Sequence, residues 1–269
     1  MGVRNVMVGL ASAAGGAAVV GLALAQNPKP AATGPVKPAS AVAPAVATEP
    51  AKAPDLSTMV TEARTALGKL RDYSGTFTRQ ERIKGALSAE QVGEMKVRTS
   101  PAGVYVNFVR PDASAGMEVS YSAKKTKVAY RPAGVAGRRG FQKIDADDAK
   151  FLADNRHPVP DWGMGPMLEL VAAAAAREKT LNNPVEVYTS EYQFAARNVT
   201  RYEILMRRPH AFRYAAKVVV FVDKETKLPV RFEAYDDPKA GSTTGELLEA
   251  YSFTDLKFNT GVGENSFEY

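Results

Sequence analysis

The sequence contains no cysteine among its 269 residues. This absence excludes disulfide bonds, thiolate metal sites, a cysteine nucleophile and the lipid-modified cysteine of a bacterial lipoprotein. Only two histidines are present, His157 and His210, which leaves little material for a histidine-built metal or acid–base centre. Composition therefore argues against most hydrolytic chemistry, and we expect no catalytic residue, no metal site and no cofactor.

The common catalytic motifs are also missing. The sequence has no G-x-S-x-G turn, Walker loop, H-E-x-x-H motif or dinucleotide-binding fingerprint. Asp154, His157 and Asp161 could offer metal ligands on one loop, but a lone histidine beside a proline is more often a turn residue. A carboxylate pair for glycoside hydrolysis stays open as an alternative, because the separation of two carboxylates is spatial. We expect a protein that is not an enzyme, with an envelope hydrolase as the weakest alternative.

The N-terminal 25 residues predict export to the periplasm. Arg4 precedes an uncharged apolar run over residues 6–24, and Ala23 and Ala25 supply the small side chains that a signal peptidase needs. Cleavage is expected before Gln26. An uncleaved anchor is the alternative, since the run is nearly as long as a membrane span.

Residues 26–55 predict a linker. They contain seven of the 17 prolines of the chain, interleaved with alanine, and no aromatic residue. Such a segment cannot bury a core, so it should be extended and disordered. The predicted organisation is therefore a signal peptide (1–25), a Pro/Ala-rich linker (26–55) and one folded domain (56–269).

The folded domain should begin with a helix and continue as strands. After Asp55, a capping residue, apolar side chains recur at three- and four-residue spacing up to Leu70. Segments rich in Val, Tyr, Phe and Thr then predict strands at 73–83, 88–98, 103–109, 117–122 and 127–131. Helices follow at 146–155 and 166–179, and strands again at 184–195, 199–207, 215–223, 228–235 and 247–258. This order, without βαβ alternation, predicts an α+β domain around one large antiparallel sheet.

Several predicted strands are apolar on both sides. In 103–109, Val104, Val106 and Phe108 point one way, while Tyr105 and Val109 point the other. An antiparallel sheet with one face in water would alternate apolar with polar residues. Both faces should therefore be covered, or one face should line an apolar cavity; a sheet packed by helices and a curved sheet around a pocket both satisfy the pattern.

Positive charge is concentrated in one region. The formal charge of the chain is +6, and residues 124–143 contain seven basic residues and no acidic one. A smaller cluster follows in 207–213. Both clusters are candidates for headgroup binding or docking to a membrane-bound donor, through Lys124, Lys125, Arg138, Arg139, Arg207 and Arg208. A solubilising surface loop is the alternative. Nucleic acid is not expected, because export and the lack of a stacking-aromatic motif count against it.

Six ordered segments resemble an uncharacterised exported bacterial family, domain of unknown function 1571. They are YSGTFTRQER (73–82), MKVR (95–98), VYVNF (104–108), RHPVP (156–160), LPVRFEAYD (228–236) and EAYSFTDLK (249–257). The likeness covers about 70–265 and departs at Asp237, where an aromatic residue is expected, and in the glycine-rich 133–140 loop. The family is similar in fold to the LolA-like periplasmic lipoprotein carriers, whose incomplete β-barrel is lidded by helices and holds acyl chains.

This resemblance implies a half-barrel with an N-terminal helix and a helical lid, acting as a monomeric, non-catalytic carrier of a lipid or of lipoprotein acyl chains. The candidate cavity and lid residues are all apolar or aromatic: Val104, Val106, Phe108, Met117, Val119, Tyr121, Trp162, Met164, Met167 and Leu168. Ordinary core packing is the alternative for each of them. A periplasmic sensor or protein-interaction module on the same fold is the alternative function, with transient contacts to a membrane surface or an envelope protein.

Overall fold

The computed structural model describes residues 55–269, except Thr126. The predicted signal peptide and nearly all of the predicted linker lie outside the described residues, so the three-part division of the chain stays a prediction.

The described chain runs from one helix through seven strands, a helical segment and five further strands. The first part comprises α1 (Leu56–Gly68), β1 (Asp72–Ile83), β2 (Ala86–Leu87), β3 (Gln91–Arg98), β4 (Gly103–Arg110), β5 (Glu118–Ser122), β6 (Lys127–Arg131), the 3₁₀ helix η1 (Gly134–Arg139) and β7 (Gln142–Asp145). The second comprises α2 (Ala149–Leu152), η2 (Val159–Asp161), α3 (Met164–Thr180), β8 (Glu186–Phe194), β9 (Arg197–Leu205), β10 (Lys217–Asp223), β11 (Pro229–Pro238), β12 (Gly245–Phe258) and η3 (Glu264–Phe267).

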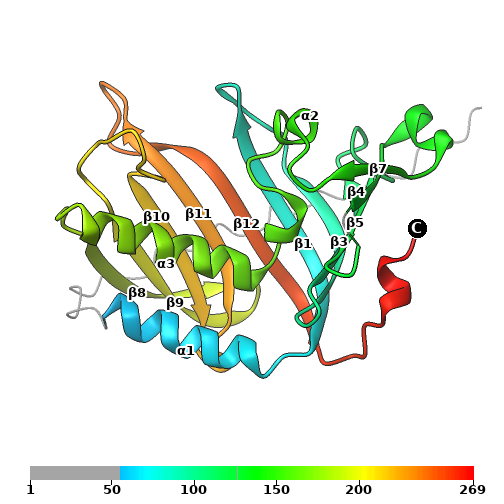
Figure 1. Ribbon diagram of the computed structural model, residues 1–269. Coiled ribbons are helices and arrows are strands. Elements are labelled where there is room, and N and C mark those ends of the chain that lie inside the picture. Colours follow the sequence, from blue (N-terminus) through cyan, green and yellow to red (C-terminus); the bar gives the residue numbers. More distant parts are fainter. Residues whose placement is uncertain (1–54, 126) are drawn as a thin grey trace, which may run out of the picture. The chain divides into compact units, whose positions relative to one another are not determined.

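All twelve strands belong to one antiparallel sheet. Its order is β7-β6-β5-β4-β3-β1-β12-β11-β10-β9-β8, with β2 paired to β1 alone. The first and last strands of the domain are joined in the middle, where β1 pairs with β12. The sheet curves and stays open, with β7 and β8 at its two edges (Figure 1). The predicted α+β class, with a large curved antiparallel sheet and helices on it, is confirmed.

Two helices cover one face of the β8–β12 half of the sheet (Figure 1). The helix α1 starts where the sequence predicts, since the Asp55 side chain accepts a hydrogen bond from Ser57 N at 3.3 Å. It buries Met59, Val60 and Ala63, which share one stripe. The helix α3 buries a similar stripe that includes Leu168, and an ion pair from Arg64 to Glu169, 2.6 Å long, joins the two helices on their exposed side. The helical layer therefore packs as one unit on the sheet.

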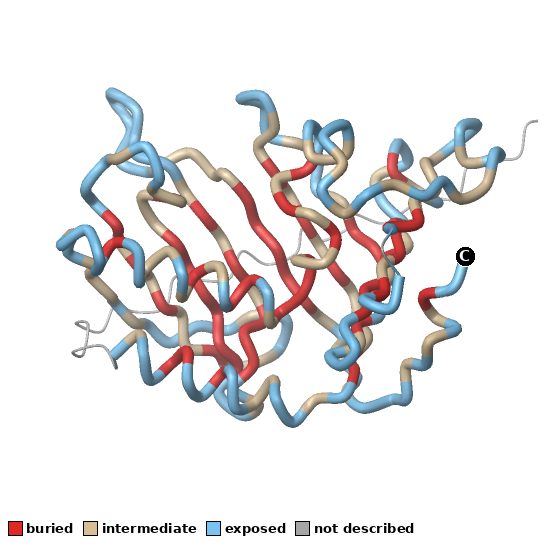
Figure 2. Tube along the Cα trace, viewed as in Figure 1, coloured by how far each residue is buried: buried red, intermediate tan, exposed pale blue. Residues whose placement is uncertain are grey.

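The main core lies on the face of the sheet that α1, α3 and residues 159–162 cover, and the buried stretches of the strands concentrate there (Figure 2). At its centre the ring of Phe77 stacks with Trp162, Tyr251 and Phe253 at centroid distances of 6.1, 6.0 and 5.6 Å. Each such pair adds about 0.5–1.5 kcal/mol beyond its burial. The aromatic cluster thus fixes the segment that carries Trp162 against the central strand.

A second, smaller core explains why β10 is apolar on both sides. Val218 and Val220 face the main core, while Val219 and Phe221 join Val199 and Val230 on the opposite face. There the rings of Phe194 and Phe221 lie 5.5 and 6.0 Å from the guanidinium of Arg231. Side chains of neighbouring strands therefore cover the outer face, and the long apolar stem of Arg231 can cover part of it.

The structure differs from the predicted elements mainly between residues 132 and 164. The predicted 146–155 helix is only four residues long. The Asp148 side chain starts it by accepting hydrogen bonds from Lys150 N and Phe151 N, both 2.9 Å. Shortly after the helix ends, the Asn155 side chain donates to the Phe151 carbonyl at 2.8 Å. The glycine-rich loop contains η1, and the short strand β7 was not predicted. Among the described residues, no helix has the length and apolar character needed to cross a membrane.

Candidate functional site

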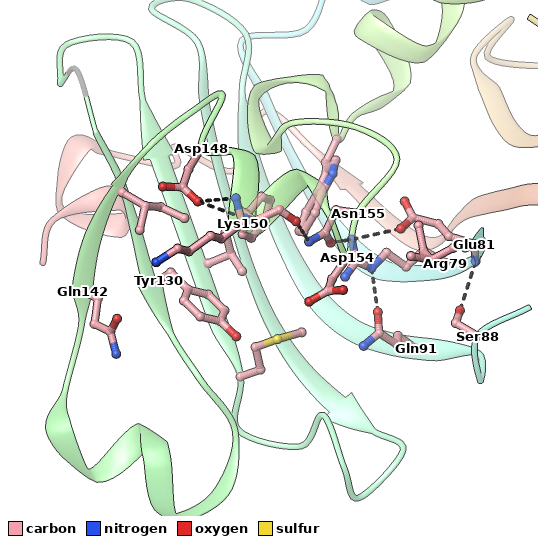
Figure 3. Close-up of a pocket in the computed structure, with 16 residues that line it drawn as sticks. Arg79, Glu81, Ser88, Gln91, Tyr130, Gln142, Asp148, Lys150, Asp154 and Asn155 are labelled. Atoms are coloured by element: carbon pink, nitrogen blue, oxygen red, sulfur yellow. Dashed lines mark hydrogen bonds and ion pairs between the residues drawn. The ribbon is translucent and has the colours of Figure 1, made fainter. Parts of the chain in front are cut away.

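A pocket of about 550 Å³ lies between the β1–β7 half of the sheet and the segment 148–162. The strands contribute Tyr130 and Gln142, and the covering segment contributes Lys150 and Asp154 (Figure 3). The full lining is Arg79, Glu81, Ile83, Ser88, Gln91, Met117, Val119, Tyr130, Gln142, Ile144, Asp148, Lys150, Phe151, Asp154, Asn155 and Trp162.

The apolar wall of this pocket follows from strand register. Val119 pairs with Tyr130, and Tyr130 pairs with Gln142, so all three side chains project from the same face of the sheet. From the covering segment, the ring of Phe151 lies 6.0 Å from the rings of both Tyr130 and Trp162. Aromatic and aliphatic side chains thus meet from both directions around the space. Exposed polar side chains such as Lys150 and Asp154 lie at its rim, and the wall also contains buried polar side chains.

Arg79 places a buried cation in the pocket wall. Its side chain donates to Gln91 Oε1 and Asn155 Oδ1, both at 2.8 Å, and its guanidinium lies 4.2 Å from the centre of the Trp162 ring. The residue is 5% exposed. Burial lowers the pKa of Arg79, and the charge of Glu81 partly opposes that effect. The cation is therefore held in one position by side chains of the sheet and of the covering segment.

A network of buried ionisable side chains continues from Arg79 behind the pocket. Glu249 Oε2 lies 2.8 Å from both His157 Nε2 and Arg156 Nε, and its other oxygen accepts a hydrogen bond from Tyr214. Tyr251 donates to Glu81, whose carboxylate also accepts from the Arg156 backbone at 3.3 Å. The network ties residues 155–157 to β1 and β12, so it fixes the base of the covering segment.

Charge neutralisation inside this network shifts its titration. Burial raises the pKa of Glu249, but the hydrogen bond from His157 and the charges of His157 and Arg156 outweigh that effect, so the pKa lies below its ordinary value. Burial and the charges of Glu81 and Glu249 raise the pKa of Tyr251 well above its ordinary value. Glu249 is thus held ionised and Tyr251 neutral, which suits a structural network.

The predicted cavity residues divide into two groups. Met117, Val119 and Trp162 line the pocket. Trp162 is completely buried and donates from Nε1 to the His157 carbonyl at 3.0 Å. The other predicted residues belong to the main core or, in the case of Tyr121, pack half-buried against it: Val104, Val106, Phe108, Tyr121, Met164, Met167 and Leu168.

The predicted headgroup residues do not gather at this pocket. Lys124 and Lys125 lie between β5 and β6, and Arg138 and Arg139 are exposed on η1, so all four are near the β7 edge. Arg207 and Arg208 follow β9, next to the opposite edge strand β8, and Arg207 Nε pairs with Glu186 at 2.9 Å. The two basic clusters therefore lie toward opposite edges of the sheet.

Sequence reasoning missed the buried network. Its members are Arg79, Glu81, Arg156, His157, Glu249 and Tyr251, with Tyr214 at its edge. The first six all fall within the segments 73–82, 156–160 and 249–257 that carry the family resemblance. The motifs of the family resemblance thus contained the residues of the network, but three segments far apart in the sequence gave no indication that these residues meet in the fold.

In the loop that was considered for a metal site, residues 154–161, two of the three candidate ligands contact other side chains. His157 contacts Glu249, and Asp154 pairs with Lys84 at 3.2 Å. Within residues 55–125 and 127–269, no group of three or more His, Cys, Asp or Glu side chains is arranged to hold a metal ion. The contacts of His157 and Asp154 are instead those of groups that fix a loop.

Comparison with known sequences identifies the family. Residues 70–269 match the family described as "Protein of unknown function (DUF1571)", and the chain belongs to this family. No curated protein matches the sequence.

Solved structures of several other proteins are similar to this chain. A putative outer membrane lipoprotein-sorting protein domain from Vibrio parahaemolyticus is 14% identical, with a TM-score of 0.39 over 80% of this chain and 97% of that one. Lipoprotein LppX from Mycobacterium tuberculosis is 10% identical, with a TM-score of 0.45 over 77% of this chain and 97% of that one. A LolA superfamily protein from Nitrosomonas europaea is 9% identical, with a TM-score of 0.32 over 81% of this chain and 99% of that one.

Proposed function

We propose that this chain is a monomeric, non-catalytic carrier that binds an amphiphile, either a lipid or an acyl chain of a lipoprotein, in the pocket beneath residues 148–162. The observation that supports this function is that apolar side chains line the pocket from both the sheet and the covering segment, while exposed polar side chains lie at its rim. The volume of about 550 Å³ lies in the range of small-molecule sites. The predicted signal peptide supports a periplasmic location for the carrier.

The distribution of polar groups around the pocket suits an amphiphile. Met117, Val119 and Ile144 offer apolar surface for a hydrocarbon chain, and Met117 adapts easily to chains of varying shape. Lys150 and Asp154 stand at the rim and are exposed, so they can meet a polar head without losing hydration. The buried network fixes the base of the covering segment, while α2 itself is short and half-exposed. The covering segment can therefore admit a chain without disturbing the core.

The test is to purify the protein from a bacterial periplasm without detergent, followed by native mass spectrometry and organic extraction. We expect a copurifying lipid in the wild type and none in Ile144→Trp, because the larger side chain fills the pocket. Val109→Trp is the matched control, since Val109 lies on β4 in the same half of the sheet, is 44% exposed and does not line the pocket. Equal lipid in both variants, or a wild type that takes up no added lipid or lipopeptide, contradicts the proposal.

Trp162 gives an independent readout, because it is the single tryptophan of the chain and lines the pocket. We expect its emission to shift as a lipid saturates the wild type. Emission that stays constant while mass spectrometry shows bound lipid would remove Trp162 from the site.

A protein-interaction module is the second candidate, and the edge strand β8 favours it. Among the described strands β8 pairs only with β9, so one side of its backbone is open to another strand. Tyr188 and Tyr192 are 41% and 51% exposed on it. If the pocket takes up no lipid, loss of partner binding on Thr189→Pro, with binding kept in Thr61→Ala on the exposed side of α1, would support this function.

A further inference from the structure

A second pocket, of about 350 Å³, lies on the opposite face of strands β5–β7. Ser120 pairs with Ala129, and Ala129 pairs with Lys143. These three side chains therefore project from the face opposite to the one that carries Val119 and Tyr130. The two pockets therefore share the same three strands as a wall but open on opposite sides. Nothing in the proposed carrier function uses this second pocket.

Lysine dominates the lining of this pocket. Lys124, Lys125, Lys127 and Lys143 line it, and no carboxylate side chain does. Lys124 pairs with Glu264 at 3.3 Å, but Glu264 also pairs with Arg98 at 2.8 Å, so this carboxylate is shared between two cations. Lys143 makes no ion pair within the described part of the chain. Lys127 pairs with Asp145, so Lys125 and Lys143 are the two lining lysines that have no carboxylate partner among the described residues.

The floor of the pocket contains a buried polar side chain, Ser120. Ser120 is 1% exposed, and its hydroxyl has no hydrogen-bond partner among the described residues. A buried hydroxyl without a partner is unusual, because such groups are normally satisfied. The neighbouring Ser122 donates instead to Glu264 at 2.7 Å. The free hydroxyl of Ser120 therefore lies at the base of a lysine-lined space.

The C-terminal residues close one side of the pocket. Phe267 is 2% exposed and its ring lies 4.9 Å from the guanidinium of Arg98. The ring of Tyr269 lies 4.0 Å from Phe141 and 6.0 Å from Tyr105. These contacts hold this wall in place, while the four lysines are exposed around the opening of the pocket.

We propose that this second pocket binds a phosphate-bearing anion. Lysine ammonium groups contribute compact charges without demanding a fixed geometry, and the Ser120 hydroxyl can donate to a phosphate oxygen. The same chemistry is offered by free phosphate and by the phosphate of a lipid headgroup, and the test separates the two sources.

The test compares the full-length wild type with Lys125→Gln/Lys143→Gln and with Ser120→Ala. Inorganic phosphate is titrated by calorimetry, and vesicles of phosphatidylglycerol in phosphatidylcholine are tested by co-sedimentation against phosphatidylcholine alone. The matched control is Lys179→Gln/Lys257→Gln, which removes the same charge from exposed positions outside the pocket. Circular dichroism checks that each variant is folded.

We expect wild type and control to bind phosphate, and the pocket double variant to bind about fivefold more weakly per lysine removed. Ser120→Ala should weaken phosphate binding while the net charge stays the same. Phosphate binding without a vesicle difference assigns the site to a free anion, whereas a loss of phosphatidylglycerol binding confined to the pocket variants assigns it to a headgroup. Absence of phosphate binding, or equal binding by the pocket variant and the control, overturns the proposal. Neither result decides the carrier proposal, which the Ile144→Trp variant tests separately.

Discussion

Glu249 is a carboxylate held within the apolar interior by partners from distant parts of the chain. It is 2% exposed and contacts His157, Arg156 and Tyr214, which lie on the covering segment and on the loop before β10. Taking a charge out of water is costly unless every partner is present. The residue therefore couples the covering segment to the central strands, and its removal should be felt by both.

The substitution Glu249→Gln should lower the free energy of unfolding by about 3–5 kcal/mol, because it removes a buried carboxylate that contacts His157 and leaves Arg156 without its counter-charge. Glu90→Gln, at an exposed position, is the control and should stay within about 0.5 kcal/mol of the wild type. Chemical denaturation of the three proteins at neutral pH measures the difference. A change below 1 kcal/mol in Glu249→Gln would show that the network contributes little to stability.

The same residue predicts how stability depends on pH. The pKa of Glu249 in the folded protein lies below its ordinary value of 4.5, so its contribution is complete above that value and is lost as the pH falls through the folded pKa. We expect the wild type to lose more stability than Glu249→Gln between neutral and strongly acidic pH. Parallel curves for the two proteins would argue against an ionised Glu249 in the folded state.

At the scale of elements, the helix α3 contributes to the packing of the main core and not to the lining of the proposed lipid pocket. Leu168 is completely buried in the main core and does not line the 550 Å³ pocket, although the sequence placed it among lid residues. Its side chain packs between the helical layer and the sheet. Its role should therefore be seen in stability and not in ligand uptake.

The substitution Leu168→Ala should cost about 2–5 kcal/mol of unfolding free energy, because it opens a cavity beneath α3. Leu181→Ala, at a position that is 48% exposed just after the helix, should cost far less. Denaturation measures both, and native mass spectrometry at a temperature where each variant is folded measures lipid. Lipid uptake lost in folded Leu168→Ala would return this residue to the binding site.

Most elements could be predicted from the sequence, because the spacing of their apolar residues and the turn residues at their ends indicate the same helix or strand. The strands around Val104 and Val220 alternate between faces, and the stripe of α1 follows a capping residue. The strand β7 was missed because its four residues are exposed or half-buried and carry no apolar alternation. The 146–155 helix was overestimated because the Asp148 side chain accepts from Phe151 N and so starts the helix late, while the Asn155 side chain donates to the Phe151 carbonyl where the helix ends.

The pocket could be predicted only in part. Met117, Val119 and Trp162 were among the predicted residues, because the family resemblance implies a cavity lined by side chains of the strands and of the helical lid. Arg79 and Glu81 were not, since they alternate with Thr78 and Gln80 in β1, and that stretch looks polar on both sides. Only the pairing of residues about 75 positions apart, as between Arg79 and Asn155, shows that these charges face inward.

For the whole domain, the order of strands places the two halves of the sequence on either side of a central pair. β1 and β12 form that pair, while β7 and β8 are the edges. The central strands are covered by the main core, and the edge strands are largely half-buried or exposed. Local opening should therefore begin at the edges and reach the centre last.

Hydrogen exchange should follow this order. We expect the backbone amides of β1 and β12 to be the slowest to exchange, and those of β7 and of the open side of β8 to be the fastest among the strands. Mass spectrometry of peptides from native-state exchange measures this, with β10 as an internal reference because all seven of its residues are buried or half-buried. Protection of β8 equal to that of β1 would indicate that something covers the β8 edge in solution.

The back-to-back position of the two pockets has a consequence for regulation. Val119 and Ser120 are adjacent in β5, yet one lines the apolar pocket and the other the lysine-lined pocket, with a single layer of backbone between them. A ligand that shifts this strand on one side also reshapes the space on the other. Thermodynamic linkage then requires the effect to be reciprocal: the factor by which an anion alters the affinity for an acyl chain equals the factor by which the chain alters the affinity for the anion.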